Sequence, residues 1–316
     1  MSISKKLKKT INFSSQRITS TLARDAHKIN IEFSNISKHV FETSKKIRGA
    51  SRKPALMIHG VASRSGTNFL NALLRLHPDL FSSPNDIFEM HFLTHTNHLL
   101  AYEHDFFASY ARNKEKIGKH DFLPLFGASF VAYLHSFVPE HQRILSKVAS
   151  SQYLRFFPHV FPHEQLLIII RDGRDVVHST MKTWPQSNFS SVCKRWRDGV
   201  RLILSFIDHY KDKHEYWMVR FEDVVVNPEK FVKEACERYQ LDESKYPFSE
   251  IDELPVIGSS KHSKKGDEIS WDPIKRPKDF KPVGRWKTWP EKRKKKFKKI
   301  AGQALIEAGY SKNLDW

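Results

Sequence analysis

The chain has 316 residues and carries 53 Lys and Arg against 35 Asp and Glu, which gives a formal net charge of +18. A hydrophobic fraction of 40%, with 12% aromatic residues, is typical of a chain that folds around a core and excludes wholesale disorder. The two cysteines, Cys193 and Cys236, are too few for a disulfide framework and are expected to be buried apolar residues.

The positive charge is concentrated in two segments. Residues 1–50 carry a net charge of +8 and residues 261–299 a net charge of +11, whereas residues 51–260 hold equal numbers of basic and acidic side chains. A nucleic-acid-binding domain is expected to be basic over the part that carries its motifs. The distribution therefore makes nucleic acid the weaker inference and points to smaller anions or to an anionic surface.

Residues 1–50 are expected to form a basic amphipathic helical extension. Apolar residues recur in steps of three or four from Ile18 to Val40, which is the pattern of one helix face. Such a helix could pack on its own domain or on a partner copy, or it could lie on an anionic membrane surface. The acidic residues on its polar face favour packing against protein. The sequence shows neither a signal peptide nor about 18 consecutive apolar residues, so we expect a cytoplasmic protein, or one peripheral to a membrane.

The main domain, residues 51–316, is expected to begin with a phosphate-binding loop. Residues 55–59 form an apolar run typical of a buried strand, residues 60–67 (GVASRSGT) a small-residue loop, and a helix with an apolar face follows. This is the arrangement in which backbone N–H groups and a helix N-terminus bind phosphate. Gly66 stands where a nucleoside triphosphatase has its lysine, which argues against ordinary ATP or GTP hydrolysis.

A second anion-binding segment is predicted after the apolar run 165–170, which is typical of a central parallel strand. The run ends at Arg171, and an arginine binds phosphate through two parallel hydrogen bonds, which a lysine cannot do. Ser179 follows about two turns into the next helix. The alternative is an ion-pair network at the helix start, Arg171 with Asp175 or Arg174 with Asp172.

Together the two segments resemble the phosphate motifs of sulfotransferases that use 3′-phosphoadenosine 5′-phosphosulfate (PAPS). The run RSGTNFL from Arg64 is similar to their 5′-phosphosulfate loop, and Arg171 to Ser179 resembles their 3′-phosphate site. The resemblance extends over about residues 54–311 and includes RFEDV from Arg220 and GRW from Gly284. It implies an α/β fold with a mainly parallel central sheet, a P-loop-like phosphate-binding topology and helices on both faces.

The resemblance implies PAPS as the sulfuryl donor and requires no metal. The loop would bind the 5′-phosphosulfate, the second segment the 3′-phosphate, and two later segments would border the adenine and close over the phosphates, with Trp286 as a packed anchor. The implied cofactor-binding residues are Arg64, Ser65, Gly66, Thr67, Asn68, Phe69, Arg171, Ser179, Ser259, Ser260, Gly284 and Arg285.

The closest local resemblance is to the carbohydrate branch of the family, the heparan-type enzymes. The triplet HPD from His77, followed by FEMHF at 88–92, is similar to their HPD and E-x-[HQ]-F-F pattern, in which the Glu is the general base. The pattern implies Glu89 as the base with His91 assisting. Arg64 and Lys147 would neutralise the departing phosphate, although Lys147 lies in an altered frame in which Ser146 replaces the family's Glu. The alternative for Glu89 is an exposed loop carboxylate.

The expected function is transfer of the sulfuryl group of PAPS to an acceptor hydroxyl of a saccharide or glycolipid, with an anionic membrane surface as a further partner of the basic ends. One alternative is a nucleotide or small-molecule kinase with a P-loop-type fold. Another is a non-catalytic protein that binds anions or membranes through those ends. His91, His95 and His98 have helical spacing that could hold zinc, but no Cys or acid completes a ligand set, so a metal site is not expected.

Overall fold

The computed structural model describes residues 36–118, 120–265 and 268–316. These residues form two compact units. The smaller consists of residues 36–50, 91–132 and 156–162, and the larger of residues 51–90, 133–155 and 163–316. Most of the amphipathic helix expected from Ile18 lies outside the described residues, which contain helix α2 (Lys38–Gly49).

The larger unit is built on a five-stranded sheet in the order β2-β3-β1-β4-β5, and every neighbouring pair is parallel. The mainly parallel sheet expected from the sequence is confirmed, and the apolar run 165–170 is one of its central strands. The strands are β1 (Leu56–Gly60), β2 (Leu80–Ser82), β3 (Arg143–Val148), β4 (Gln165–Ile170) and β5 (Tyr216–Arg220).

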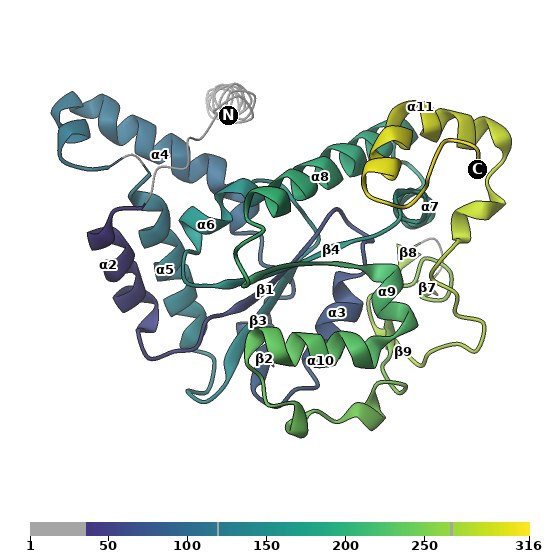
Figure 1. Cartoon of the computed structure of the whole chain (residues 1–316), viewed down its shortest axis with the longest axis horizontal. Coiled ribbons are helices and arrows are strands. Elements are labelled where there is room, and N and C mark those ends of the chain that lie inside the picture. Colours follow the sequence, from purple (N-terminus) through teal and green to yellow (C-terminus); the bar gives the residue numbers. More distant parts are fainter. Residues whose placement is uncertain (1–35, 119, 266–267) are drawn as a thin grey trace, which may run out of the picture. The chain divides into compact units, whose positions relative to one another are not determined.

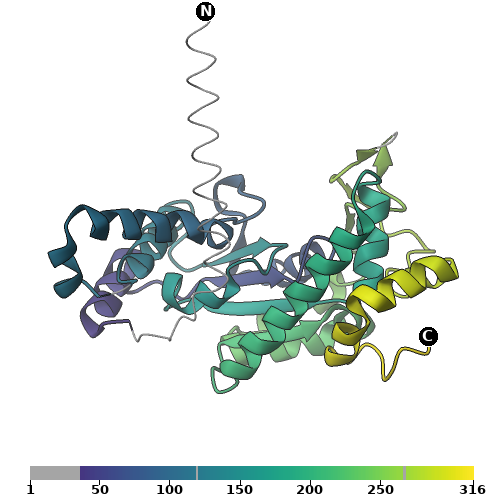
Figure 2. The same ribbon diagram turned by 90° about the horizontal axis from the view of Figure 1, so that it is seen from above.

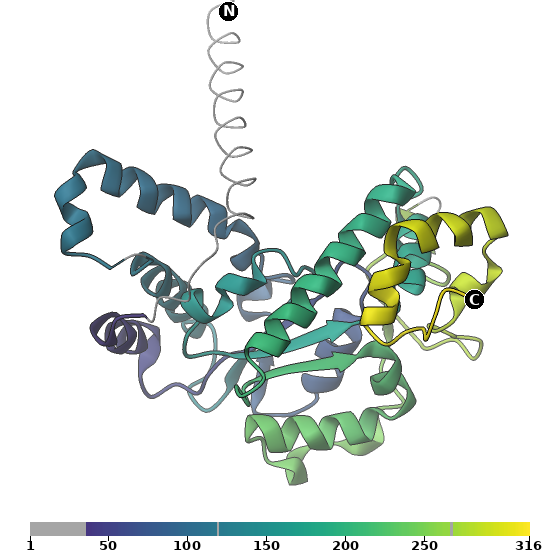
Figure 3. The ribbon, with the colours of Figure 1, turned by 45° about the horizontal axis from the view of Figure 1, so that its top comes forward.

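Helices cover both faces of this sheet (Figure 1). On one face lie α3 (Thr67–Leu74) and α10 (Pro228–Tyr239), with the short α9 (Phe221–Val226) directly after β5. On the other face lie α7 (Gly173–Thr183), α8 (Phe189–His209) and α11 (Glu291–Glu307). Figure 2 shows α8 running across the sheet with α11 beside it, and Figure 3 shows α8 and α10 on opposite sides of the strands.

The main core lies between the sheet and helices α3 and α10. Leu56, Ile58, Leu145, Leu167 and Ile169 point from the strands into this core and are fully buried. Because side chains alternate along a strand, Lys147 is expected on the same face as Leu145, and Arg171 on the same face as Ile169. Both cations therefore continue apolar rows at the carboxyl ends of their strands.

The strand order brings the predicted site residues to one edge. Strand β1 is flanked by β3 on one side and by β4 on the other, so the chain changes direction across the sheet at β1. In open parallel sheets, ligands bind outside the carboxyl ends of the strands at such a point. The phosphate loop follows β1, Arg171 follows β4 and Lys147 lies one residue before the end of β3.

Two small antiparallel pairs complete the larger unit, β6 (Val256–Ile257) with β9 (Pro273–Ile274) and β7 (Lys264–Lys265) with β8 (Glu268–Ile269). The smaller unit contains α2, α4 (Thr96–Ser109), most of α5 (Phe122–His135) and α6 (Phe157–Val160). Its interior is aromatic: the Phe92 ring stacks on Phe130 with centroids 4.6 Å apart and contacts Phe161 at 5.6 Å. Among the described residues, no helix has the length and apolar character to cross a membrane.

Candidate active site

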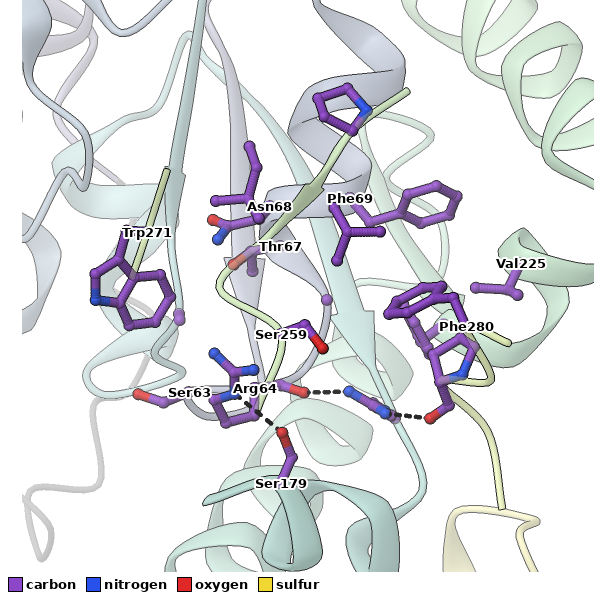
Figure 4. A pocket seen from close by; sticks show the side chains of 18 of the residues that line it. Ser63, Arg64, Thr67, Asn68, Phe69, Ser179, Val225, Ser259, Trp271 and Phe280 are labelled. Atoms are coloured by element: carbon purple, nitrogen blue, oxygen red, sulfur yellow. Dashed lines mark hydrogen bonds between the residues drawn. The ribbon is translucent and has the colours of Figure 1, made fainter. Parts of the chain in front are cut away.

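A cavity of about 810 Å³ opens at the carboxyl ends of β1 and β4, within the larger unit. Its wall comes from the phosphate loop, the start of α9 and the segment 255–285, and it reaches Glu89 and Ala149. Figure 4 shows this lining with Arg64, Ser179, Ser259 and Trp271 converging near the loop. The cavity thus joins the predicted phosphate-binding residues to the predicted general base.

The phosphate loop turns sharply between β1 and α3. Arg64 has φ 74° and Gly66 φ 104°, so two residues of the turn lie in the left-handed region. A side chain at Gly66 would also meet Phe221, since a Cβ there would lie 2.3 Å from its ring. No side chain caps α3, and the N–H groups of Phe69 and Leu70 bond to the Gly66 carbonyl. The first N–H groups of the helix, those of Thr67 and Asn68, are therefore available to an anion.

Arg64 lines the cavity beside Ser63 and Ser179. Its Nε donates to Ser179 Oγ at 3.0 Å (Figure 4). Its NH2 group donates to the Gly258 carbonyl at 2.5 Å. The Trp271 ring covers the guanidinium, with its centroid 5.5 Å from Cζ. Burial, together with the positive charges of Arg171 and Arg285, lowers the pKa of Arg64 to about 10.

Arg171 lies beside the phosphate loop, at the end of β4. Its NH1 group donates to the Arg64 carbonyl at 2.8 Å and its NH2 group to the Pro282 carbonyl at 2.5 Å, while its Nε has no hydrogen-bond partner among the described residues. The guanidinium packs over the Phe221 ring, 4.4 Å from its centroid. Burial lowers the pKa of Arg171, and Asp175 and Glu222 oppose that shift.

The ion pair considered as an alternative does exist, but it involves Arg174 rather than Arg171. Arg174 and Asp172 are both buried and bond through both carboxylate oxygens, with the shortest distance 2.7 Å. The Asp172 side chain also accepts from the Arg174 N–H and caps α7. Arg171 is therefore left to face the cavity.

Asp175 ties the C-terminal segment to the start of α7, a role the sequence analysis missed. Its carboxylate accepts from the N–H of Gly284 at 2.7 Å and from the N–H of Trp286 at 3.2 Å. Trp286 packs against Arg174, 3.9 Å from the ring centroid, in agreement with its expected role as an anchor. These contacts hold Arg285 at the cavity wall.

At the other end of the cavity, Glu89 lies beside Lys147. The Lys147 Nζ is 3.5 Å from Glu89 Oε1 and 3.6 Å from the centroid of the Phe88 ring, and the Lys147 side chain is only 2% exposed. A backbone hydrogen bond of 2.8 Å from Met90 N–H to the Lys147 carbonyl fixes this segment on β3. Burial lowers the pKa of Lys147, and the Glu89 carboxylate limits that shift.

The predicted residues differ in how they contribute to the cavity. Ser65 is buried under the loop, where its hydroxyl bonds to Ala62, and Ser260 is buried with its Oγ 3.4 Å from Ser179 Oγ. Lys147 lies behind Glu89, and Gly284 acts through its backbone. The lining includes Arg64, Gly66, Thr67, Asn68, Phe69, Glu89, Arg171, Ser179, Ser259 and Arg285.

His91 belongs to the smaller unit, where the Thr94 hydroxyl donates to its carbonyl at 2.6 Å. Its part in catalysis stays a prediction. The described residues contain no group of three His, Cys, Asp or Glu side chains arranged to hold a metal ion. His91, which precedes α4, does not share a continuous helix face with His98.

Phe221 and Trp271 are two further cavity residues that sequence reasoning missed. Phe221 supports both Gly66 and Arg171, and Trp271 covers Arg64. Phe221 directly follows Arg220 in the RFEDV motif, so its motif position was the available signal. Trp271 lies in a segment without a motif, and only the fold reveals it.

Comparison with known proteins places the chain in a family. A model of the sulfotransferase family matches residues 54–245. A protein-tyrosine sulfotransferase from Drosophila melanogaster is 20% identical over 221 residues, which cover 66% of this chain and 42% of that protein. This chain thus spans about two fifths of the length of that relative.

The solved structures that are similar to the chain include two sulfotransferases of low sequence identity. The sulfotransferase domain of the olefin synthase of Synechococcus PCC 7002 is 18% identical, with 80% of this chain and 95% of that domain covered and a TM-score of 0.48. A mouse sulfotransferase complexed with PAP is 10% identical, with 89% of this chain and 94% of that chain covered and a TM-score of 0.48. Since the family model matches more than half of its length, the chain belongs to the sulfotransferase family.

Proposed function

We propose that this protein transfers the sulfuryl group of PAPS to a hydroxyl of a saccharide or glycolipid acceptor. The observation that carries the proposal is the single cavity that joins Arg64, Arg171 and Ser179 at one end to Glu89 at the other. Such a cavity can bind a nucleotide with two phosphate groups and present one of them to a second substrate.

The end of the cavity formed by Arg64, Arg171 and Ser179, the phosphate end, fits the 3′- and 5′-phosphates of PAPS. Burial lowers the pKa of Arg64, Arg171 and Arg285, and the positive charge of Arg171 adds to the shift at Arg64 and Arg285. Arg171 Nε is buried without a hydrogen-bond partner among the described residues. A buried unpaired donor and three neighbouring cations favour a multiply charged anion, because it supplies both the missing acceptor and the missing charge.

The loop would bind the 5′-phosphosulfate through its backbone. Thr67 and Asn68 are the first two residues of α3, and their N–H groups lie at the helix N-terminus, where the helix dipole stabilises an anion. Phe69 and Phe221, whose rings meet edge to face at 6.1 Å, supply apolar surface for the adenine. Bound PAPS would supply an activated sulfuryl group, and sulfuryl transfer resembles phosphoryl transfer in depending mainly on positioning and charge stabilisation.

Glu89 is the proposed general base. It lines the cavity, and it would accept the proton of the acceptor hydroxyl at its carboxylate. Lys147 Nζ, 3.5 Å away, keeps the carboxylate oriented and brings a positive charge to the region where negative charge moves onto the phosphate. Phe88 covers the Lys147 ammonium and limits the access of water to the pair.

The sequence from His77 to Phe92 supports a saccharide or glycolipid acceptor, because it resembles the carbohydrate branch. The name of the Drosophila relative describes a protein-tyrosine sulfotransferase, so tyrosine peptides are the necessary comparison in any acceptor screen.

Two measurements test the proposal. Calorimetry should show that the full chain binds 3′-phosphoadenosine 5′-phosphate (PAP) at least about tenfold more tightly than ATP, because only PAP carries a phosphate for Arg171 and Ser179. A transfer screen with labelled PAPS over saccharides, glycolipids, phenols and tyrosine peptides, read as the mass shift of sulfation, then identifies the acceptor. Equal affinity for PAP and ATP would refute the proposed cofactor, and Mg²⁺-dependent ATP turnover would favour a kinase. Transfer to tyrosine peptides but to no saccharide or glycolipid would refute the proposed acceptor class.

A further inference from the structure

A second cavity, of about 240 Å³, adjoins the first between the phosphate loop, α7 and α8. Ser63 and Trp184 line both cavities, so they mark the boundary between them. The remaining polar lining comes from Thr180, Ser187 and Arg195, and the rest of the wall is apolar. Neither the phosphate-binding residues nor the proposed base belongs to this second cavity.

The polar side chains of the second cavity are not engaged by the protein. Within residues 36–118, 120–265 and 268–316, no hydrogen bond or ion pair involves the side chains of Ser63, Thr180, Ser187 or Arg195. Other arginines of the same helix are paired, Arg197 with Asp198 at 2.7 Å and Arg201 with Glu307 at 2.7 Å. Arg195 therefore presents an uncommitted guanidinium at the cavity wall.

This combination of groups fits one ring of a sugar that carries an anionic substituent. An indole offers a flat apolar face to the C–H groups of a pyranose, the three hydroxyls can bond to sugar hydroxyls, and a guanidinium binds a carboxylate or sulfate through two parallel bonds. The volume is below the roughly 300–1,000 Å³ of pockets for drug-sized ligands, so it suits a single ring rather than a chain.

The shared residues indicate how such a ring would reach the reaction. Glu89, Ser63 and Trp184 all line the larger cavity, and Ser63 and Trp184 also line the smaller one, so the two cavities share a boundary on the wall of the cavity that holds Glu89. Arg64 and Arg171 remain with the nucleotide in the larger cavity. We propose, on the basis of the proposed function, that the smaller cavity binds an anionic sugar ring of the acceptor while another ring presents its hydroxyl to Glu89.

The test uses the full chain and three tetrasaccharides, measured by calorimetry in the presence of PAP. One alternates glucuronic acid with N-acetylglucosamine, one is neutral chitotetraose, and one is 6-O-sulfated chitotetraose. The two anionic probes should bind about tenfold more tightly than the neutral one, as expected for a charge-assisted pair. Comparison of the two anionic probes shows whether a carboxylate or a sulfate is preferred.

Variants assign the effect to the cavity. Arg195→Ala should remove the preference for anionic probes, whereas Lys194→Ala, which removes an equal charge from the neighbouring position of α8, should change their Kd by less than about twofold because Lys194 does not line the cavity. Trp184→Ala should weaken all three probes, because the stacking surface is lost. Equal effects of Arg195→Ala and Lys194→Ala, or equal binding of neutral and anionic probes, would overturn the proposal.

PAP binding by the same samples separates this proposal from the proposed function. If wild-type protein binds PAP but none of the tetrasaccharides, the sugar subsite is refuted and the cofactor assignment stands. If it binds the anionic probes through Arg195 but binds PAP no better than ATP, the cofactor assignment is refuted and the anionic sugar site stands.

Discussion

The two ends of the larger cavity hold their cations in different ways. At the phosphate end, Arg64 and Arg171 are fixed by backbone carbonyls and by aromatic rings, and neither guanidinium forms an ion pair within the described residues. At the opposite end, where Glu89 lines the cavity and transfer is proposed to occur (the transfer end), Lys147 lies beside the Glu89 carboxylate. A carbonyl orients a guanidinium without cancelling its charge, whereas a carboxylate cancels most of it.

The difference matches what each end is proposed to do. The phosphate end keeps net positive charge for an anion that arrives with the cofactor, and it is supported by α7 and α8, which bury many of their side chains. The transfer end stays near neutrality, so that one proton can move to Glu89 without a large change in local charge. Four predictions follow from this contrast, each aimed at one end or at its scaffold.

The largest effect is expected from Glu89→Gln. Loss of a general base lowers transfer rates by about 10²–10⁴-fold, while PAP binding at the far end should stay within about twofold. The measurement is the initial rate of sulfation of the acceptor found in the screen, together with calorimetry of PAP. Asp86→Asn, which removes an exposed carboxylate three residues earlier, is the matched control and should retain activity. A Glu89→Gln protein with wild-type rates would exclude Glu89 as the base.

Arg171→Ala should act on the opposite end. Loss of the charge-assisted hydrogen bond from Arg171 Nε to the 3′-phosphate, worth about 1.5–3 kcal/mol, should raise the Kd of PAP by about 10-fold or more. ATP, which lacks that phosphate, should be affected much less. Arg201→Ala, which removes a surface arginine paired with Glu307, serves as the control in the same calorimetric titration. A change of less than about threefold in PAP affinity would contradict the role of Arg171.

Gly173→Ala tests whether the phosphate end depends on the packing behind it. A Cβ at position 173 would lie 2.4 Å from the Trp196 ring, whose Nε1 donates to the Arg171 carbonyl at 3.0 Å. Overpacking of this kind costs about 1–3 kcal/mol in the free energy of unfolding. Chemical denaturation measures the loss, and a double-mutant cycle with Trp196→Phe should recover part of it. Additive effects of the two substitutions would show that the ring and the glycine are not in contact.

The smallest effect is expected from His178 on α7. Burial and the surrounding cations, Arg285 foremost, lower the pKa of His178 to about 4 from an ordinary 6.5, and its Nδ1 accepts from the Trp289 indole at 3.1 Å. The unfolded chain therefore binds more protons than the folded chain between pH 6.5 and 4, so stability should fall as the pH falls through that window. His178→Asn should show a shallower decline in denaturation series at pH 7 and pH 5. Identical slopes for the two proteins would exclude this histidine as the source.

The places of the loop, Arg171 and Ser179 in the fold were largely predictable from sequence, because these elements are local. The loop from Gly60 to Thr67 follows a strand and precedes a helix within a dozen residues, and Arg171 and Ser179 belong to one strand–helix unit. The sheet was predictable for the same reason, since the apolar run 165–170 is typical of a strand buried on both faces.

Contacts between distant segments were not predictable in this way. Asp175 accepts from the N–H groups of Gly284 and Trp286, more than a hundred residues away, and nothing in the local sequence marks this pairing. The same holds for Trp271 over Arg64 and for the second cavity between the loop, α7 and α8.

The sequence by itself determined the phosphate motifs, the parallel sheet and the separation of charge between the ends and the body of the chain. These depend on residue type, periodicity and short spacing, all of which are local properties. Only the tertiary structure decided which positive charges are not neutralised by an acidic side chain, because that depends on whether a carbonyl or a carboxylate from another segment contacts each cation. Arg171 and Lys147 both continue rows of apolar side chains on their strands, yet the first faces the cavity among carbonyls and the second lies beside Glu89.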